Sequence, residues 1–294
     1  GGNGASSHVA VCDDLTFLTG LRRRVALAGV GPRGIAVLGE RGFVCEYFSD
    51  TLGVVTLTAA NAPTRQIALG PSPVMTQKRR GEMLFNSAEL CLQNWLSCET
   101  CHPDARTDGL NWDLMNDGLG NPKNTRSMLL VHETPPAMAS GVRPSAQEAV
   151  RAGLRHIQFT VRAEEDAAAI DAYLKALEPV STPYRSRGGL SESARRGERL
   201  FFDEKIGCGV CHPVPRFTDL KPYDVRSQGS HDRTGAFDTP TLIECWRTAP
   251  YMHDGSYTTL RELIERGRHG ATHGAVNDLT PEQIQDLVEF MLSL

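Results

Sequence analysis

Two short cysteine–histidine motifs constrain this chain more than any other feature of its sequence. The motifs place two sulfurs and an adjacent imidazole at Cys98, Cys101 and His102, and again at Cys208, Cys211 and His212. This CxxCH spacing is the attachment signature of c-type haem, because two thioethers hold the porphyrin edge while the histidine ligates iron from the proximal side. The sequence therefore predicts two covalent haem c groups, with His102 and His212 as the proximal iron ligands.

Two other chemistries use paired cysteines and must be weighed against haem attachment. One zinc ion shared by both pairs would need them close together, but Cys98 and Cys208 are too far apart in the chain for a compact zinc ribbon. A thioredoxin-like dithiol would need a βαβ pattern around each pair, and the flanking sequence has none. Covalent haem is the interpretation that explains both cysteines and the histidine.

Composition and charge narrow the class of protein. The 294 residues are 40% apolar and 22% charged, which is ordinary for a globular protein, and the length allows two or three domains. A net charge of −4 gives no basic surface for nucleic acid, so we expect no nucleic-acid partner. No apolar run reaches the length of a transmembrane helix, so no membrane span is expected.

The haem motifs also predict the compartment. Covalent haem is normally attached outside the cytoplasm, so we expect a periplasmic or extracellular protein, and a chain that starts at Gly1 is typical of a processed or trimmed product. Such a compartment permits disulfides among the other four cysteines, but the sequence does not fix a pairing, and free buried thiols are an equal alternative. These residues are Cys12, Cys45, Cys91 and Cys245.

Residues 1–74 differ from the rest of the chain. Short runs of β-forming residues alternate with Gly and Pro turn signals, which is typical of a sandwich, barrel or propeller. The expected strands are His8–Cys12, Arg24–Ala28, Gly34–Leu38, Phe43–Phe48, Val54–Thr58 and Gln66–Leu69. The stretch 31–57 resembles one blade of a YVTN-type β-propeller, with the end of a preceding blade before it. Either the segment ends a larger propeller or its strands form a small sheet.

The remainder of the chain has helical periodicity and an internal repeat. Lys78–Ser87, with a continuation over Glu89–Leu96, leads into the first motif, and a similar helix over 191–202 leads into the second. The two share an R-x-G-x-x-L-F pattern, which predicts two related cytochrome c domains, 75–180 and 181–294. The other expected helices are Ala146–Leu154, Ala163–Leu177 and the C-terminal Thr280–Leu294.

The order of these motifs resembles a known family. The repeated helix and CxxCH are followed by Thr239-Pro240-Thr241-Leu242 and then by a TAPYxHDG run at 248–255. Together they are similar to the di-haem cytochrome c peroxidase and MauG superfamily, in particular members fused to YVTN propellers, over residues 75–294. The resemblance implies a mostly α fold with two tandem cytochrome c domains behind the β segment. It also implies a calcium ion between the haems, held at Asn124, Thr248 and Pro250.

The chain departs from the family pattern around both haems. The resemblance places the distal Gln of the peroxidases at Gln147 and their acid–base Glu near Gln158 or Phe159, and a glutamine cannot exchange protons. The family's tryptophan between the haems should fall near Met138–Ser140, and none is present.

The distal ligands of both haems are also altered. The second haem's distal ligand should fall near Gly267, so His269 becomes the candidate, with His273 less well placed. At the first haem Asn116 stands where some relatives have His, so that side is either open or filled by Met115.

Three functions remain open on the sequence. The first is a di-haem redox enzyme that meets peroxide at the haem of His102 and receives electrons through the haem of His212, from a small redox protein or another donor. The second is an electron-transfer module without catalysis, which the missing Glu and Trp favour. The third is MauG-like modification of a partner protein, which would need a docking surface.

Covalent attachment is directly testable. We expect about two haems per chain to survive acid–acetone extraction and denaturing electrophoresis, because thioethers persist where iron–ligand bonds do not. Cys98→Ser and Cys208→Ser should each remove one haem and leave the other. A chain that loses its colour, or that carries zinc by elemental analysis, would contradict this interpretation.

Overall fold

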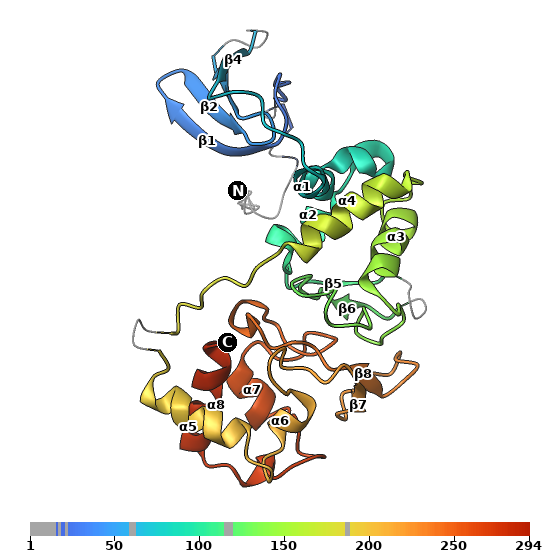
Figure 1. Cartoon of the computed structure of the whole chain (residues 1–294), viewed down its shortest axis with the longest axis vertical. Helices are drawn as coiled ribbons and strands as arrows, with labels where there is room; N and C mark the ends of the chain where they lie inside the picture. Colours follow the sequence, from blue (N-terminus) through green and yellow to red (C-terminus); the bar gives the residue numbers. More distant parts are fainter. Residues whose placement is uncertain (1–15, 17–18, 21–22, 59–62, 115–119, 186–188) are drawn as a thin grey trace, which may run out of the picture. The chain divides into compact units, whose positions relative to one another are not determined.

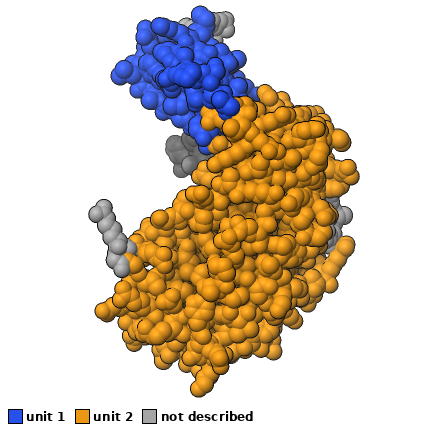
Figure 2. All heavy atoms as spheres, viewed as in Figure 1, with its two compact units in different colours: residues 1–74 blue, residues 75–294 orange. Residues whose placement is uncertain are grey.

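The computed structural model describes residues 16, 19–20, 23–58, 63–114, 120–185 and 189–294. Two compact units make up the chain, Gly1–Val74 and Met75–Leu294 (Figures 1 and 2). In the described residues, no helix is both long and apolar enough to cross a membrane. Each unit is therefore considered by itself.

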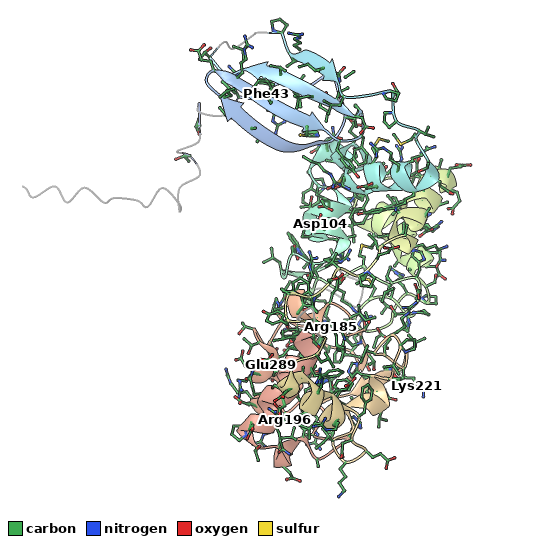
Figure 3. The ribbon with its side chains drawn as sticks, turned by 60° about the vertical axis from the view of Figure 1, so that its left-hand side comes forward. Phe43, Asp104, Arg185, Arg196, Lys221 and Glu289 are labelled. Atoms are coloured by element: carbon green, nitrogen blue, oxygen red, sulfur yellow. The ribbon has the colours of Figure 1, made fainter. Side chains whose placement is uncertain are left out.

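The first unit is a four-stranded antiparallel meander in the order β1-β2-β3-β4. Its strands are β1 (Pro32–Leu38), β2 (Arg41–Glu46), β3 (Thr51–Thr56) and β4 (Arg65–Ala68). Phe43, labelled in Figure 3, lies on β2 opposite Val54 of β3. Four of the expected strands are thus present. The meander agrees with both alternatives, one propeller blade and a small sheet.

One predicted strand of this unit is wrong. Arg24–Ala28 forms no strand in the structure, and His8–Cys12 lies outside the described residues. The segment near residue 29 instead meets a buried carboxylate, because the Gly29 amide donates to Glu46 Oε1 at 3.0 Å. Burial opposes ionisation of Glu46, yet hydrogen bonds from Thr51, Gln66 and Gly29 leave its pKa below the ordinary value.

Helices predominate in the described part of the second unit. They are α1 (Gln77–Asn86), α2 (Cys98–Cys101), α3 (Ala146–His156), α4 (Glu164–Lys175), α5 (Glu192–Phe201), α6 (Cys208–Cys211), α7 (Leu260–Glu265) and α8 (Pro281–Leu292). Two small hairpins accompany them, β5 (Asn111–Trp112) with β6 (Lys123–Asn124), and β7 (Pro222–Asp224) with β8 (Ala236–Asp238). Side-chain oxygens cap five of the helices at Thr76, Ser145, Ser191, Thr259 and Thr280.

The predicted continuation of helix over Glu89–Leu96 is also wrong. The chain makes two 3₁₀ turns there, Ala88–Leu90 and Leu92–Asn94. Gln93 and Asn94 have φ angles of 57° and 54°, which an α-helix does not permit. The kink redirects the chain toward the first CxxCH motif.

The internal repeat appears as two equivalent helix pairs, α1 with α4 and α5 with α8. A Cβ atom on Gly81 would lie 1.8 Å from the Ala169 carbonyl oxygen, and one on Gly197 would lie 1.8 Å from that of Asp286. Glycine at these positions lets the helix backbones touch. The residue before each glycine adds an ion pair to the same partner helix.

These ion pairs repeat as closely as the glycines do. Arg80 Nη2 lies 2.5 Å from Asp166 Oδ1, and Arg196 contacts both oxygens of Asp286 at 2.7 Å. Figure 3 labels Arg196 on α5 and Glu289 on α8, which locate the second helix pair. Each helix pair is the centre of a hydrophobic cluster. The cluster around α1 and α4 contains Phe85, Leu90, Ile170 and Leu174. The cluster around α5 and α8 contains Phe201, Ile264, Leu287 and Phe290.

The close helix contact predicts a sensitive position. Gly197→Ala should lower the free energy of unfolding by about 1–3 kcal/mol, because the added methyl overpacks the α5–α8 contact. Arg195→Ala is the control on an exposed position of the same helix, and it should stay within about 0.5 kcal/mol of the wild type. Denaturant unfolding measures both, and equal stability of the two variants would contradict the role of Gly197.

Candidate functional site

The first CxxCH motif is one capped helical turn. Ser97 precedes α2, and its amide donates to Thr100 Oγ1 at 3.0 Å while the Thr100 amide donates to the Ser97 carbonyl at 3.1 Å. The His102 amide closes the turn onto the Cys98 carbonyl at 3.0 Å. This local geometry brings Cys98, Cys101 and His102 together at one end of the turn.

His102 is oriented by two backbone carbonyls. Its Nδ1 lies 3.1 Å from the carbonyl oxygen of Arg106 and 3.1 Å from that of Arg126. Burial lowers the pKa of His102, although the two carbonyls oppose the shift, so the ring is neutral at pH 7. Because Nδ1 donates to carbonyls, Nε2 carries the lone pair, which is the arrangement of a histidine that ligates a metal.

The second motif repeats this arrangement on α6. His212 Nδ1 lies 2.8 Å from the Phe217 carbonyl oxygen, and burial again lowers the pKa of the ring. The phenyl rings of Phe201 and Phe217 are 6.0 Å apart, and Phe201 lies 6.4 Å from the His212 ring. The second imidazole thus has an aromatic surrounding that fits the packing of a flat apolar macrocycle.

The structure argues against the zinc and dithiol interpretations. Among the described residues, no group of three or more His, Cys, Asp or Glu side chains is arranged to hold a metal ion. Burial raises the pKa of Cys98 to about 12 and that of Cys208 to about 11, whereas redox dithiols act as thiolates. The donor set of each motif fits two thioethers and one iron-ligating imidazole.

The remaining described cysteines form no disulfide. Cys91 and Cys245 are buried free thiols, and Cys45 is an exposed free thiol in the first unit. Cys12 lies outside the described residues. For Cys91 and Cys245 the free-thiol alternative is the one present in the structure.

Gln158 lies directly beside the first motif. Its Nε2 lies 3.7 Å from Cys98 Sγ, its side chain is buried, and its Oε1 has no hydrogen-bond partner among the described residues. The helix α3 ends at His156, so Gln158 follows the helix rather than lying on it. A buried amide oxygen without a partner is costly, and it marks a place where a ligand could supply the missing donor.

Gln147 lies at the other end of the same helix. It occupies the first turn of α3, roughly 14 Å along the helix axis from His156 at 1.5 Å per residue. The structure therefore does not bring Gln147 and Gln158 together. Met115 and Asn116 lie outside the described residues.

The loop after α7 approaches the second motif. The Ala275 amide donates to the Lys205 carbonyl at 2.7 Å, and a Cβ on Gly274 would lie 2.0 Å from the Ile206 carbonyl oxygen. This loop is therefore fixed against the residues that lead into Cys208. Gly267 leaves room for the Tyr257 ring, which a Cβ would meet at 2.7 Å.

His269 on this loop is close enough to His212 for the two rings to interact electrostatically. Its Nδ1 is buried without a partner in the described part of the chain. Burial, with the charges of His212 and His273, lowers the pKa of His269 to about 4, so the ring is neutral at pH 7. His273 differs, because its Nε2 contacts the Asp224 carbonyl at 3.2 Å.

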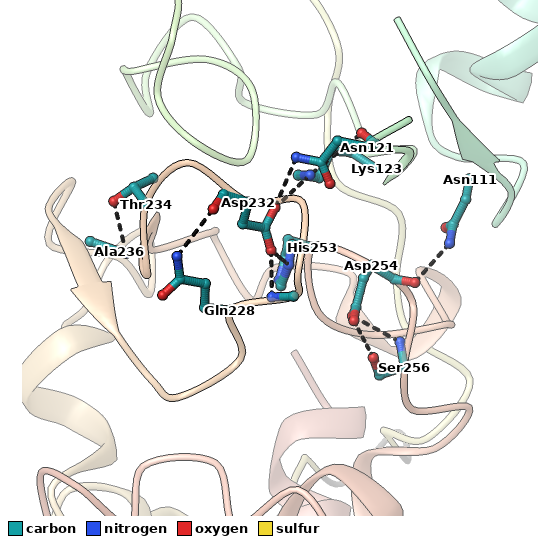
Figure 4. A network of polar contacts seen from close by, with 11 residues as sticks. Asn111, Asn121, Lys123, Gln228, Asp232, Thr234, Ala236, His253, Asp254 and Ser256 are labelled. Carbon is teal, nitrogen blue, oxygen red and sulfur yellow. Dashed lines mark hydrogen bonds and ion pairs between the residues drawn. The ribbon is translucent and has the colours of Figure 1, made fainter. Parts of the chain in front are cut away.

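The predicted calcium residues lie in an oxygen-rich corner. Asn124 Nδ2 donates to the Gly109 carbonyl at 3.2 Å and to Asn111 Oδ1 at 3.1 Å. Asn111 in turn donates to the Asp254 carbonyl at 2.8 Å, as Figure 4 shows. The corner offers amide and carbonyl oxygens, which are the ligand types that calcium prefers.

Pro250 borders this corner, whereas Thr248 makes a local contact. A Cβ on Gly255 would lie 3.0 Å from both Asn124 Nδ2 and Pro250 Cγ, so both residues crowd the same glycine. The Thr248 hydroxyl instead donates to the Cys245 carbonyl at 3.4 Å. Asn124 and Pro250 are thus brought together, with Thr248 two residues away along the chain.

Sequence reasoning missed the polar contacts that join the N-terminal half of this unit (75–180) to its C-terminal half (189–294). Asp232 accepts from Lys123 Nζ at 2.7 Å and from Asn121 Nδ2 at 3.1 Å, and it contacts His253 Nε2 at 2.9 Å (Figure 4). His253 also stacks on Phe237 with ring centroids 3.8 Å apart. The TAPYxHDG run was the available signal, since it contains His253.

Two arginines also cross between the halves. Arg106 contacts both carboxylate oxygens of the fully buried Glu244 at 2.8 and 2.9 Å, and Arg126 Nη1 donates to Asp238 Oδ2 at 2.8 Å. The sequence alone does not predict these ion pairs, because the partners lie more than a hundred residues apart in the chain.

Comparisons with known proteins place the chain in a family, although no family model matches it. It is 30% identical over 271 residues to hydrazine synthase subunit gamma of Kuenenia stuttgartiensis, covering 74% of this chain and 77% of that protein. It is 25% identical over 268 residues to the methylamine utilization protein MauG of Methylophilus methylotrophus, covering 71% and 80%. The solved structure of the Kuenenia hydrazine synthase matches with a TM-score of 0.69 and 28% identity, over 76% of this chain and 89% of that one.

The chain belongs to the di-haem cytochrome c peroxidase and MauG superfamily. The segment Met138–Ser140, where the resemblance predicts a tryptophan, has no aromatic side chain. The backbone of that segment nevertheless reaches the C-terminal half, because the Asp238 amide donates to the Ala139 carbonyl at 2.9 Å. Arg126 donates to the adjacent Met138 carbonyl at 2.9 Å.

The Asp232 contacts predict acid sensitivity of the junction between the halves. Burial opposes ionisation of Asp232, but bonds from Lys123, Gly229, Asn121 and His253 hold its pKa well below the ordinary 3.8. A carboxylate with a depressed pKa contributes stability that is fully present above about pH 4 and is lost as the pH falls toward the folded-state value.

Asp232→Asn should therefore lower the free energy of unfolding at pH 7 by roughly 1–3 kcal/mol, since Lys123 loses its charged partner. The difference from the wild type should shrink as the pH falls below 4. Denaturant unfolding at pH 7 and pH 3 measures it, and a difference that grows on acidification would contradict the assignment.

Proposed function

We propose that this chain is a di-haem c-type redox protein of the superfamily, with one haem on each CxxCH motif and one cytochrome c domain around each haem, at 75–180 and 181–294. The observation that carries the proposal is the shared geometry of His102 and His212, whose Nδ1 atoms both donate to backbone carbonyls. That contact presents Nε2 to a metal at each site. Covalent haem attachment implies export to the periplasm or beyond.

The first haem is the site of reaction with peroxide in this proposal. When bound, its iron supplies an electron and a coordination position. Gln158 would lie beside a haem attached at Cys98, because its amide is 3.7 Å from the sulfur of that residue. The unpartnered Oε1 can accept a hydrogen bond from a small protic ligand such as peroxide, but an amide cannot move the proton onward.

The second haem relays electrons. His269 would supply the distal ligand of a haem bound there, because the loop that carries it is fixed against the residues before Cys208 and its buried Nδ1 has no partner in the described residues. Two imidazole ligands would close this iron to substrate and suit it to electron transfer. The electron donor is a small redox protein or another external reductant.

Turnover with peroxide tests the role of Gln158. The wild type should react slowly, because general acid–base help from the missing Glu is typically worth about 10²–10⁴-fold. Gln158→Glu should accelerate the reaction of the reduced protein with peroxide by about 10²-fold in rapid-mixing spectroscopy. Gln147→Glu is the matched control at the far end of α3 and should change little. A fast wild-type reaction, or equal gains in both variants, would show that Gln158 is not in the pocket.

Absence of any peroxide reaction would favour the second candidate, an electron-transfer protein without catalysis. The observation that favours it is the pair of closed proximal environments with no acid–base residue beside Cys98. Spin-resonance spectra separate the two, because the catalytic candidate requires one high-spin iron and the electron-transfer candidate requires both irons to be low-spin.

Calcium completes the proposal. Asn124 and the backbone around Thr248 and Pro250 would hold one ion between the haems, since the corner offers amide and carbonyl oxygens. Chelation should lower the melting temperature and alter the haem spectrum, and added calcium should restore both. Asn124→Ala should abolish this response, whereas Asn121→Ala, which removes the contact with Asp232, should keep it. No calcium by elemental analysis of the native protein would end the assignment.

A further inference from the structure

The carbonyl groups that contact His102 belong to charged residues, whereas the carbonyl that contacts His212 belongs to Phe217. Both belong to arginines, Arg106 and Arg126, each at 3.1 Å from His102 Nδ1. Each arginine also sends its guanidinium group to a carboxylate in the C-terminal half. The imidazole of the first motif is therefore held through two residues whose side chains are anchored in the half that carries the second motif.

The Arg106 arm is rigid. Its guanidinium contacts both oxygens of Glu244 and also donates to the Glu178 carbonyl at 3.1 Å. The exposed fractions of the two side chains are 7% for Arg106 and 0% for Glu244. Two charge-assisted hydrogen bonds that are buried from solvent fix the Arg106 backbone in one position.

The side chain of Arg126 is more exposed to solvent than that of Arg106. Arg126 is 31% exposed, while its partner Asp238 is 2% exposed. Arg126 Nη1 bridges Asp238 Oδ2 and the Met138 carbonyl, at 2.8 and 2.9 Å. Asp238 Oδ1 has no hydrogen-bond partner in the described part of the chain, so this carboxylate depends on Arg126.

Asp238 continues toward the second motif. The next residue, Thr239, accepts a hydrogen bond from the Thr218 hydroxyl at 2.7 Å through its carbonyl. Thr218 follows Phe217, whose carbonyl lies 2.8 Å from His212 Nδ1. An unbroken series of covalent and hydrogen bonds therefore joins the two proximal imidazoles through the Arg126–Asp238 ion pair.

Such a series can transmit a change at one metal to the other. The strength of the acceptor at Nδ1 sets the basicity of a ligating imidazole and hence the properties of its metal. A charge change at one end shifts the ion pair and the carbonyls attached to it. Coupling of this kind is reciprocal, so each site affects the other by the same free energy.

We propose that Arg126 and Arg106 are positioning residues that couple the two haems, with the Arg126–Asp238 ion pair as the adjustable link. The midpoint potential of each haem then depends on the oxidation state of the other. This inference rests on the proposed function, because it requires both haems to be bound at His102 and His212.

The test uses the intact holoprotein and three variants. Arg126→Met removes the guanidinium but leaves the carbonyl that His102 contacts. Asp238→Asn changes the charge with little change in size. Lys123→Met is the matched control, because Lys123 also crosses to the C-terminal half, at 2.7 Å from Asp232, but it does not supply a carbonyl to His102.

Spectroelectrochemical titration measures the midpoint potential of each haem with the other oxidised or reduced. In Arg126→Met and in Asp238→Asn we expect the reduction equilibrium of the first haem to change about tenfold, which is about 59 mV for one electron. The dependence of each potential on the other haem should also fall. Lys123→Met should match the wild type, and Arg126→Lys should recover part of the coupling.

Two outcomes would overturn the coupling role. One is unchanged potentials in both Arg126→Met and Asp238→Asn with two haems still bound. The other is an equal shift in Lys123→Met, which would reveal a general effect of loosening the contact between the halves. If Arg126→Met does not fold, Asp238→Asn decides alone. Failure of the proposed function is separate, since it would appear as fewer than two haems per chain in the wild type.

Discussion

The ion pair between Arg106 and Glu244 is the contact on which the arrangement of residues 75–294 depends most. Glu244 is fully buried, and besides Arg106 it accepts from the Val180 amide at 2.6 Å, while its own amide donates to the Leu294 carbonyl at 3.3 Å. The carboxylate of Glu244 thus joins the N-terminal half to the connection between the halves, and its backbone amide reaches the C-terminal residue. Loss of one partner would leave an unpaired buried charge, which is far costlier than the pair itself is stabilising.

The internal repeat explains why two similar sites exist but does not make them equal. Each half packs a helix pair through a glycine and an arginine–aspartate contact, and each places a CxxCH turn next to that pair. The carbonyls that hold the two histidines differ. Those around His102 belong to arginines anchored across the molecule, whereas the Phe217 carbonyl at His212 belongs to an aromatic cluster. A repeated scaffold therefore holds its two histidines in different ways.

The polar contacts between the halves make each site depend on the other half. Asp232, Asp238 and Glu244 all come from the C-terminal half, and their cationic partners Lys123, Arg126 and Arg106 all come from the N-terminal half. The three pairs hold the two halves together, and two of them belong to the arginines whose carbonyls contact His102. The tertiary contact is in this sense part of the site.

The sequence by itself predicted the haem attachment residues, and it correctly indicated the helices before each motif and the superfamily. These are local properties, since two cysteines and a histidine within five residues need only one helical turn to come together, and glycine at 81 and 197 repeats within a recognisable pattern. It overextended the helix over Glu89–Leu96, because periodicity does not reveal residues such as Gln93 and Asn94 that adopt positive φ angles. It also assigned a strand to Arg24–Ala28 from composition alone.

Only the tertiary structure decided which polar residues meet. Gln147 and Gln158 looked like one pair in the sequence, but a helix of fixed rise per residue holds them apart. Arg126 and Asp238 looked unrelated, yet the fold sets them 2.8 Å apart and ties both to the proximal histidines. Side chains separated by more than a hundred residues are brought together by packing of the two halves, and no local pattern records that packing.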